Sequence, residues 1–282
     1  MKVLRHILAA LTITALARAA AAQSPTPAPK PAATPETAAS GDAKEGQALF
    51  AKVVEGFGGK KKVDTVKDVQ TRGELTAKTP EGDTKMDVQT ALVFPDKLSQ
   101  QVDSPFGRFT MVATPEGAFL VGPPGSQDLP DGMKQELLKQ VRRVPLYLAQ
   151  KSDDPKLSVV ATGSAQVLGV ETKILEVRYD DLSVRWFVDP KTGRILRTVH
   201  TATGPDGKPL EMSSDYLDYR DESGFPIAHR LEVTTNGEKD QTLVLEECKI
   251  NAGVDPVLFR KPPPIPTRVP PTPEPQKTPT PG

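Results

Sequence analysis

The chain has 282 residues, with 36 Lys and Arg against 36 Asp and Glu, and a single cysteine. The charges are mixed along the chain without long runs of one sign, which argues against a nucleic-acid-binding protein and against a polybasic membrane surface. One cysteine excludes an internal disulfide, so the fold must be stabilised by burial of apolar side chains. We interpret Cys248 itself, in "TLVLEECKIN", as a small buried residue of a strand.

The first 22 residues predict a secretory signal peptide. Lys2 and Arg5 precede an apolar run, and three alanines at 20–22 follow it. The run is roughly ten residues long, well short of the roughly 20 that a membrane-spanning helix needs. We therefore expect residues 1–22 to be removed and the mature chain to be exported to the periplasm, with no transmembrane segment. Signal removal leaves 33 basic against 36 acidic residues.

Proline-rich segments flank the body of the chain. Residues 23–41 are rich in Pro, Ala and Thr, and residues 263–282 are still richer in Pro. We expect a disordered linker and a disordered tail, because neither segment can bury a core. PxxP spacings in the tail are those of ligands for aromatic grooves, but the composition is also that of a plain spacer, which we favour. Residues 42–262 are long enough for one sizeable core.

A helix is predicted at the start of this body. Asp42 is suited to cap its N-terminus, and Gly58 and Gly59 are suited to end it. Apolar residues recur on one helical face. They are Leu49, Phe50, Val53, Val54 and Phe57.

After the glycine pair the apolar period changes to two. Short runs such as "KDVQTRGELTAK" and "TKMDVQTALVF" are separated by turn sequences such as "TPEGD" and "TPEG". Met86 and Val88 share a face of one run, and Phe109 and Met111 share a face of another. This pattern predicts an antiparallel meander.

A second helix is predicted within "LPDGMKQELLKQVRRVPLYLAQ". Met133, Leu137, Leu138 and Val141 form its apolar stripe. Its basic residues lie elsewhere, and Pro145 is expected to break the helix. A basic amphipathic helix can lie on a membrane surface, but we interpret this one as covering one face of a sheet.

The meander then resumes, and "VRWFVDPKTGRILRTVH" reads as a hairpin. Asp189, Pro190 and Gly193 are turn residues. Trp186 falls on the apolar face of the first strand, and His200 is one residue of the return strand. Together the two meanders predict an α+β fold: a strongly curved antiparallel sheet, an unclosed barrel of about 11 strands, with helices packed on its concave face.

No enzyme motif is present. The chain has three histidines and no HExxH, HxxEH, GxSxG, CxxC or glycine-rich phosphate loop. Adjacent acids such as Asp153 and Asp154 point to opposite faces of a strand or sit in turns, which makes them poor acid–base pairs. We predict no catalytic residue, no metal site and no cofactor.

A few polar residues leave two interpretations open. His229 shares a strand face with Ile227, Leu231 and Val233. It is either a residue that binds a head group or senses pH, or a buried histidine bonded to a backbone carbonyl or water, which we favour. Arg72, Arg185 and Arg230 either meet an anionic head group or line solvent.

Three segments carry a family resemblance: "VRWFVDPKTGRILR", "SDYLDYRDESGFPIAHRLEV" and "VDPVLFRKP". With the order of helix, "GG", "TRGEL" strand, central helix and second meander, residues 42–262 resemble a distant member of the LolA/LolB-like outer-membrane lipoprotein-sorting proteins. The resemblance implies an unclosed barrel whose apolar concave face binds acyl chains beneath a helical lid. The chain departs from the aromatic-rich carriers, since only 5% of it is aromatic. Similar segments also resemble modules attached to insulinase-type zinc peptidases.

Two functions follow. The first is a non-catalytic periplasmic carrier of an acyl chain, lipoprotein or other apolar ligand. Its predicted pocket residues are Met86, Val88, Phe109, Met111, Leu137, Val141 and Trp186. The alternative is a structural or accessory envelope protein with a filled core, whose partner is an envelope protein such as a peptidase.

Overall fold

A computed structural model describes residues 41–79, 82–123, 125–204 and 207–263. The predicted signal peptide lies outside these residues, as do the predicted linker apart from Gly41 and the predicted tail apart from Pro263.

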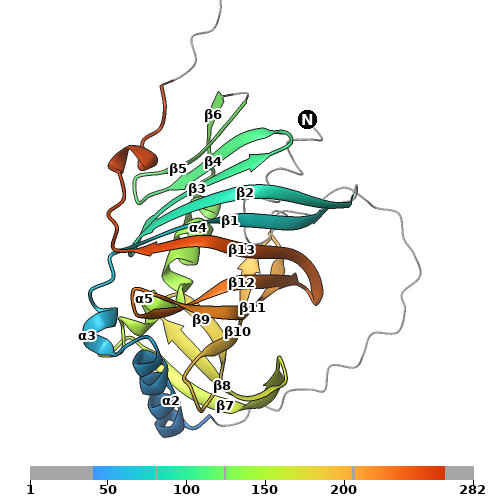
Figure 1. The fold of residues 1–282 in the computed structure, drawn as a ribbon. Coiled ribbons are helices and arrows are strands. Elements are labelled where there is room, and N and C mark those ends of the chain that lie inside the picture. Colours follow the sequence, from blue (N-terminus) through green and yellow to red (C-terminus); the bar gives the residue numbers. More distant parts are fainter. Residues whose placement is uncertain (1–40, 80–81, 124, 205–206, 264–282) are drawn as a thin grey trace, which may run out of the picture.

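The described residues form one antiparallel sheet of 13 strands in the order β6-β5-β4-β3-β2-β1-β13-β12-β11-β10-β9-β8-β7 (Figure 1). The strands are β1 (Asp68–Thr79), β2 (Gly82–Val93), β3 (Lys97–Ser104), β4 (Gly107–Ala113), β5 (Ala118–Gly122), β6 (Gly125–Asp128), β7 (Ser158–Val167), β8 (Val170–Tyr179), β9 (Leu182–Val188), β10 (Ile195–Thr203), β11 (Pro209–Glu222), β12 (Phe225–Thr235) and β13 (Glu238–Ile250). The α+β prediction of a curved, unclosed antiparallel sheet is confirmed, with 13 strands in place of about 11. Strands such as β6, a four-residue polar segment, pair through their backbone and carry no alternating pattern to predict.

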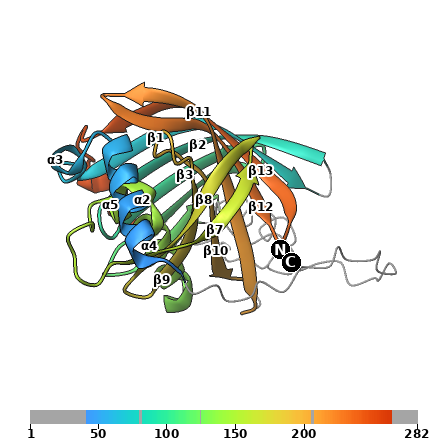
Figure 2. The same ribbon diagram turned by 90° about the horizontal axis from the view of Figure 1, so that it is seen from below.

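The order of the strands leaves β6 and β7 as the two edges of the sheet. Each half is a meander, and the pairing of β1 with β13 joins the two halves. The chain must therefore pass from one edge to the other between β6 and β7. It does so through α4 (Asp131–Arg143) and α5 (Pro145–Ala149), which lie on the concave side of the sheet (Figure 2). Val144 alone separates the two helices, so the predicted break at Pro145 is confirmed.

Helix α2 (Ala43–Gly56) docks on the edge strand β7. The backbone amide of Glu45 donates to Asp42 Oδ1 at 2.9 Å, which confirms the predicted cap. Asp42 also exchanges two backbone hydrogen bonds with Ala161 of β7. Gly46 allows the close approach, because a Cβ atom there would lie 2.7 Å from the carbonyl oxygen of Val159. The helix thus covers an edge that would otherwise be open to other strands.

The predicted hairpin of β9 and β10 is confirmed, and its turn packs against α2. Asp189 Oδ1 accepts the Lys191 amide at 2.9 Å, and Gly193 has a positive φ of 73°. A Cβ atom on Gly193 would lie only 2.3 Å from the carbonyl oxygen of Lys52 in α2. Glycine is needed here for both the left-handed backbone and the contact.

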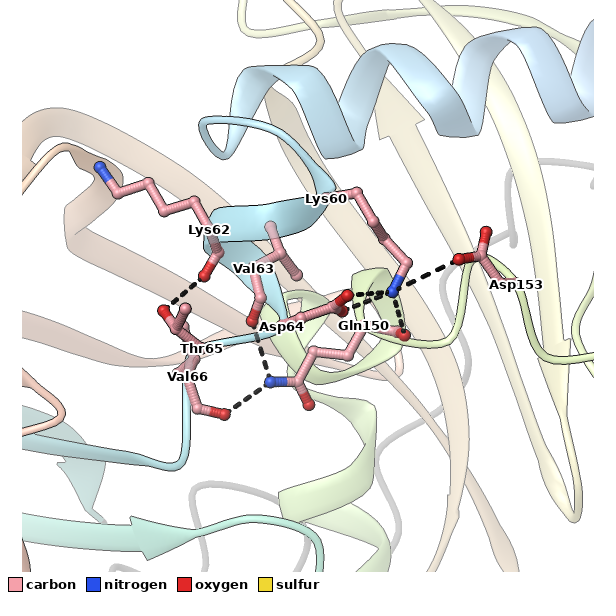
Figure 3. A network of polar contacts seen from close by, with 8 residues as sticks. All are labelled: Lys60, Lys62, Val63, Asp64, Thr65, Val66, Gln150 and Asp153. Carbon is pink, nitrogen blue, oxygen red and sulfur yellow. Dashed lines mark hydrogen bonds and ion pairs between the residues drawn. The ribbon is translucent and has the colours of Figure 1, made fainter.

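Figure 3 shows how α3 (Lys60–Val63) is tied to the residue that follows α5. The Gln150 amide nitrogen donates to the carbonyl oxygens of Val63 at 3.0 Å and Val66 at 2.6 Å. Lys60 Nζ donates to the carbonyl oxygen of Gln150 at 3.3 Å and pairs with Asp64. This network holds the three lysines at 60–62 and Val63 as a short helix against the end of α5.

Two main apolar clusters form the core. One lies among α2, α3, α5 and the strands β7–β10. The other lies between α4 and the strands β1–β5 and β13. Cys248 is buried as predicted, and burial, followed by the nearby charge of Glu222, raises the pKa of its thiol to about 11.

Glycine-to-alanine substitutions test the docking of α2. We expect Gly46→Ala to lower the free energy of unfolding by about 1–3 kcal/mol, because its Cβ atom would press on the β7 backbone. Gly132→Ala in α4 is the matched control, since nothing lies within 4 Å of its Cβ position. The control should be neutral or gain up to about 1 kcal/mol from helix propensity. Equal stability of the two variants in urea unfolding would contradict the close approach.

Candidate ligand-binding site

Six of the seven predicted pocket residues form one apolar layer. Met86 and Val88 come from β2, Phe109 and Met111 from β4, and the last two from α4. The two on α4 are Leu137 and Val141. All six are at most 6% exposed. The layer exists because the apolar stripe of α4 packs onto the inner face of β1–β5.

The seventh predicted residue, Trp186, lies in the other apolar cluster. Its ring is fully buried and stacks on Phe50 of α2, with ring centroids 5.6 Å apart. Its indole nitrogen has no acceptor among the described residues. The structure therefore divides the predicted lining between a layer under α4 and a layer under α2.

Two of the hollows in the described part of the chain are a polar one beside α4 and a groove on the outer face of the sheet, and none of these seven residues lines either of them. In this structure the side chains of α4 and α2 occupy the space between the predicted lining residues. A ligand that uses the apolar layer must therefore displace a helix.

The first hollow lies beside α4, on the side away from the apolar layer, and has a volume of about 300 Å³. Glu136, Lys139 and Arg143 of α4 form one wall. Their spacing of three and four residues places them on one face of the helix. The strands β9 and β10 form the opposite wall, which includes Ser183 and His200. Thus the polar stripe of α4 faces the other half of the sheet.

Ion pairs organise this polar hollow. Arg143 lies 2.6 Å from Glu136, and the Arg143 side chain is only 11% exposed. Lys139 and Arg142 approach Asp181 at 3.1 and 3.2 Å, which ties α4 to the turn before β9. Arg143 Nε is buried and has no hydrogen-bond partner among the described residues.

His200 projects into the same hollow from β10. Burial, and then the charge of Arg143, lowers the pKa of its imidazole to about 3, so the ring is neutral at physiological pH. Its Nε2 atom is buried and lacks a hydrogen-bond partner within the described ranges. Sequence reasoning treated His200 as an ordinary strand residue and missed Glu136 and Arg143. The spacing along α4 was the available signal, but its meaning depends on strands far along the chain.

The remaining polar candidates have ordinary roles. His229 is 1% exposed, with Nδ1 3.1 Å from the carbonyl oxygen of Leu245 and Nε2 2.7 Å from a Glu222 oxygen. This supports the interpretation of a buried, hydrogen-bonded histidine. Arg72 and Arg230 are half-exposed and pair with nearby glutamates. Arg185 alone of the three arginines borders the polar hollow.

The second hollow is a groove of about 680 Å³ on the outer face of β1–β5. Its far wall is the segment after β13, which includes the 3₁₀ helix η1 (Pro256–Phe259). Lys261 holds this segment through an ion pair of 2.7 Å with Asp128 of β6. Apolar residues on the groove floor include Val112 and Phe119.

No group of three or more His, Cys, Asp or Glu among the described residues is placed to hold a metal ion. Likewise, none of the helices in the described ranges is long and apolar enough to cross a membrane.

Comparison with known proteins places the fold. No protein-family profile matches the chain, and no curated protein matches it. Among solved structures, a DUF1329 family protein from Desulfovibrio piger gives a TM-score of 0.52 at 11% identity, over 78% of this chain and 98% of its own. A LolA superfamily protein from Nitrosomonas europaea gives 0.50 at 12% identity, over 77% and 97%. The chain shares the fold of these structures, as the sequence resemblance implied.

The pKa of His200 predicts how stability depends on pH. The folded pKa of about 3 lies below the ordinary value of 6.5, so acid favours the unfolded chain. The contribution of the neutral His200 ring to the free energy of unfolding is complete above pH 6.5 and is lost as the pH falls toward 3. Between pH 7 and pH 5 we expect His200 to contribute a loss of about 2 kcal/mol. His200→Gln should show a correspondingly flatter pH profile in urea unfolding, and parallel profiles would contradict the assignment.

Proposed function

We propose that this protein is an exported, periplasmic, non-catalytic carrier of a lipidated or otherwise apolar ligand. One observation carries the proposal. On the inner face of the LolA-type sheet, strands β1–β5 and β13 present an apolar layer that a single helix, α4, covers. The domain that would carry the ligand is residues 42–262, with the signal peptide and proline-rich segments outside it.

The energies permit an acyl chain to take the place of α4. Burying a methylene group contributes about 0.8 kcal/mol, so a 16-carbon chain gains about 12 kcal/mol before any cost. Re-exposing Leu137, Leu138 and Val141 of α4 costs about 1.5–3 kcal/mol each, or about 5–9 kcal/mol together. The burial of the acyl chain therefore exceeds the cost of exposing the α4 side chains, so the ligand can bind. The difference between the two free energies is small enough for the ligand to be released again.

Helix α4 is also less firmly anchored than α2. The side chain of Asp42 caps α2, and backbone hydrogen bonds tie its start to β7. By contrast, no side-chain hydrogen bond caps the N-terminal end of α4 at Pro130. Weakly held elements are the ones that move when ligands bind.

The second candidate function is a structural or accessory envelope protein. It is favoured by the burial of all seven predicted lining residues, which describes a filled core. Its partner surface would be the outer groove, which the segment before the proline-rich tail borders.

Native mass spectrometry of protein purified from the periplasm separates the two functions. The carrier should retain lipid, and added monopalmitoylglycerol should appear as a bound adduct. A change in the fluorescence of Trp186, the single tryptophan of the chain, would show that the ligand also reaches the layer under α2. A protein that is free of lipid and does not respond to monopalmitoylglycerol would overturn the carrier and favour the accessory protein.

A charge-removing variant tests whether α4 must move. Asp181→Asn removes the ion pairs to Lys139 and Arg142, which together hold α4 by about 1 kcal/mol. We expect the affinity for monopalmitoylglycerol to rise roughly two- to fivefold, since the binding-competent state becomes more populated. Asp153→Asn is the matched control, because Asp153 is exposed and pairs only weakly with Lys60 at 3.7 Å. Equal affinities would show that α4 stays in place.

A further inference from the structure

We propose that the polar hollow between α4 and the strands β9 and β10 binds an oxyanion, a carboxylate or a phosphate, with Arg143 and His200 as donors. That the oxyanion is the head group of the carried ligand rests on the proposed function. The anion site itself rests only on the hollow.

The position of the hollow is the first argument. An amphipathic helix on a sheet normally turns its polar stripe to water. Here the stripe of Glu136, Lys139 and Arg143 faces the opposite half of the same sheet. The side chains of Arg143 and Glu136 are only 11% and 18% exposed. Charged groups are seldom placed inside a fold unless they are paired or meet a ligand.

The hydrogen bonds that remain open are the second argument. Every carboxylate of the lining has a cation beside it: Glu136 has Arg143, Glu176 has Arg178, Asp181 has Lys139 and Arg142, and Glu211 has Arg185. The two buried polar atoms of the hollow without a partner among the described residues are Arg143 Nε and His200 Nε2. A guanidinium nitrogen can only donate, and the neutral imidazole donates from Nε2 in one of its two tautomers.

The open donors and the size of the hollow then indicate the ligand class. The lining holds four carboxylates and three cations, and each carboxylate already has a cation beside it, so the open Nε donor of Arg143 is left for a further acceptor. An oxyanion would give Arg143 Nε a charge-assisted hydrogen bond, which is about twice as strong as a neutral one. The volume of about 300 Å³ is at the small end of ligand pockets and leaves room for a carboxylate or a phosphate. Ser183 and Thr201 supply hydroxyl groups at the wall.

The hollow lies next to the apolar layer, and this position indicates which ligand a carrier of this kind would bind. One helix, α4, presents Leu137 and Val141 to the layer and Arg143 to the hollow. A ligand with an acyl chain and an anionic head could therefore engage both faces of α4. The chain would take the place of Leu137 and Val141 on the layer, and the head group would bind between Arg143 and His200. The ligand class this implies is an anionic amphiphile, a fatty acid or a phospholipid-like molecule.

The anion site can be tested without any lipid. Inorganic phosphate and acetate are titrated into the full mature chain while the imidazole resonances of His200 are followed by NMR. We expect saturable shifts, at least tenfold weaker binding in Arg143→Gln, and no more than a twofold change in the control Lys134→Gln. Lys134 is a cation of the same helix that pairs with Asp131 at 3.0 Å and does not line the hollow. The double variant Glu136→Gln/Arg143→Gln, which keeps the net charge, should fold and fail to bind.

Three palmitoyl probes then identify the source of the anion: palmitate, monopalmitoylglycerol phosphate and neutral monopalmitoylglycerol. At least tenfold tighter binding of an anionic probe than of the neutral one, lost in Arg143→Gln, assigns the hollow to a lipid head group. Phosphate binding that depends on Arg143 without any preference among lipids assigns it to a free anion. No shift dependent on Arg143 with phosphate or acetate overturns the anion site, even if the neutral lipid binds. Failure of the neutral lipid alone counts against the carrier and leaves the anion site intact.

Discussion

The structure depends on the packing of α4 inside the curve of the sheet. A sheet of 13 strands that curls must fill its concave face, because exposed apolar side chains there would cost about 25 cal/mol for each Å². Helix α4 fills one half with its apolar stripe and turns its charged stripe to the other half. The same helix thereby closes the core and creates a polar hollow beside it.

The pairing of β1 with β13 makes this arrangement possible. It brings the two meanders into one sheet, so that the connection from β6 to β7 passes from one edge to the other, and α4 and α5 take it across the concave side. The edge left at β7 is covered by α2, which Asp42 and Gly46 allow to approach closely. Helix α4 connects the two edges and has no side-chain cap at Pro130, so we expect a ligand to displace α4 and to leave α2 in place.

Features set by neighbouring residues could be predicted from the sequence. The cap at Asp42, the turn ending at Gly193 and the helix break before Pro145 each follow from short-range hydrogen bonds and backbone sterics. The predicted lining residues are buried. However, Trp186 lies in the cluster under α2, whereas the other six predicted residues lie in the cluster under α4. The short polar strand β6 has no periodicity, so it could be recognised only by its partner β5.

The sequence by itself determined the expectation of export, the curved antiparallel sheet and the apolar stripe of α4. All of these follow from local properties: an N-terminal apolar run, the alternation of side chains, turn residues and helical spacing. Only the tertiary structure decided what the polar stripe faces. Arg143 and His200 are brought together by the crossing of α4 over strands that follow it much later in the chain. Whether a charged side chain meets water or a buried wall depends on such long-range contacts, and no local pattern encodes them.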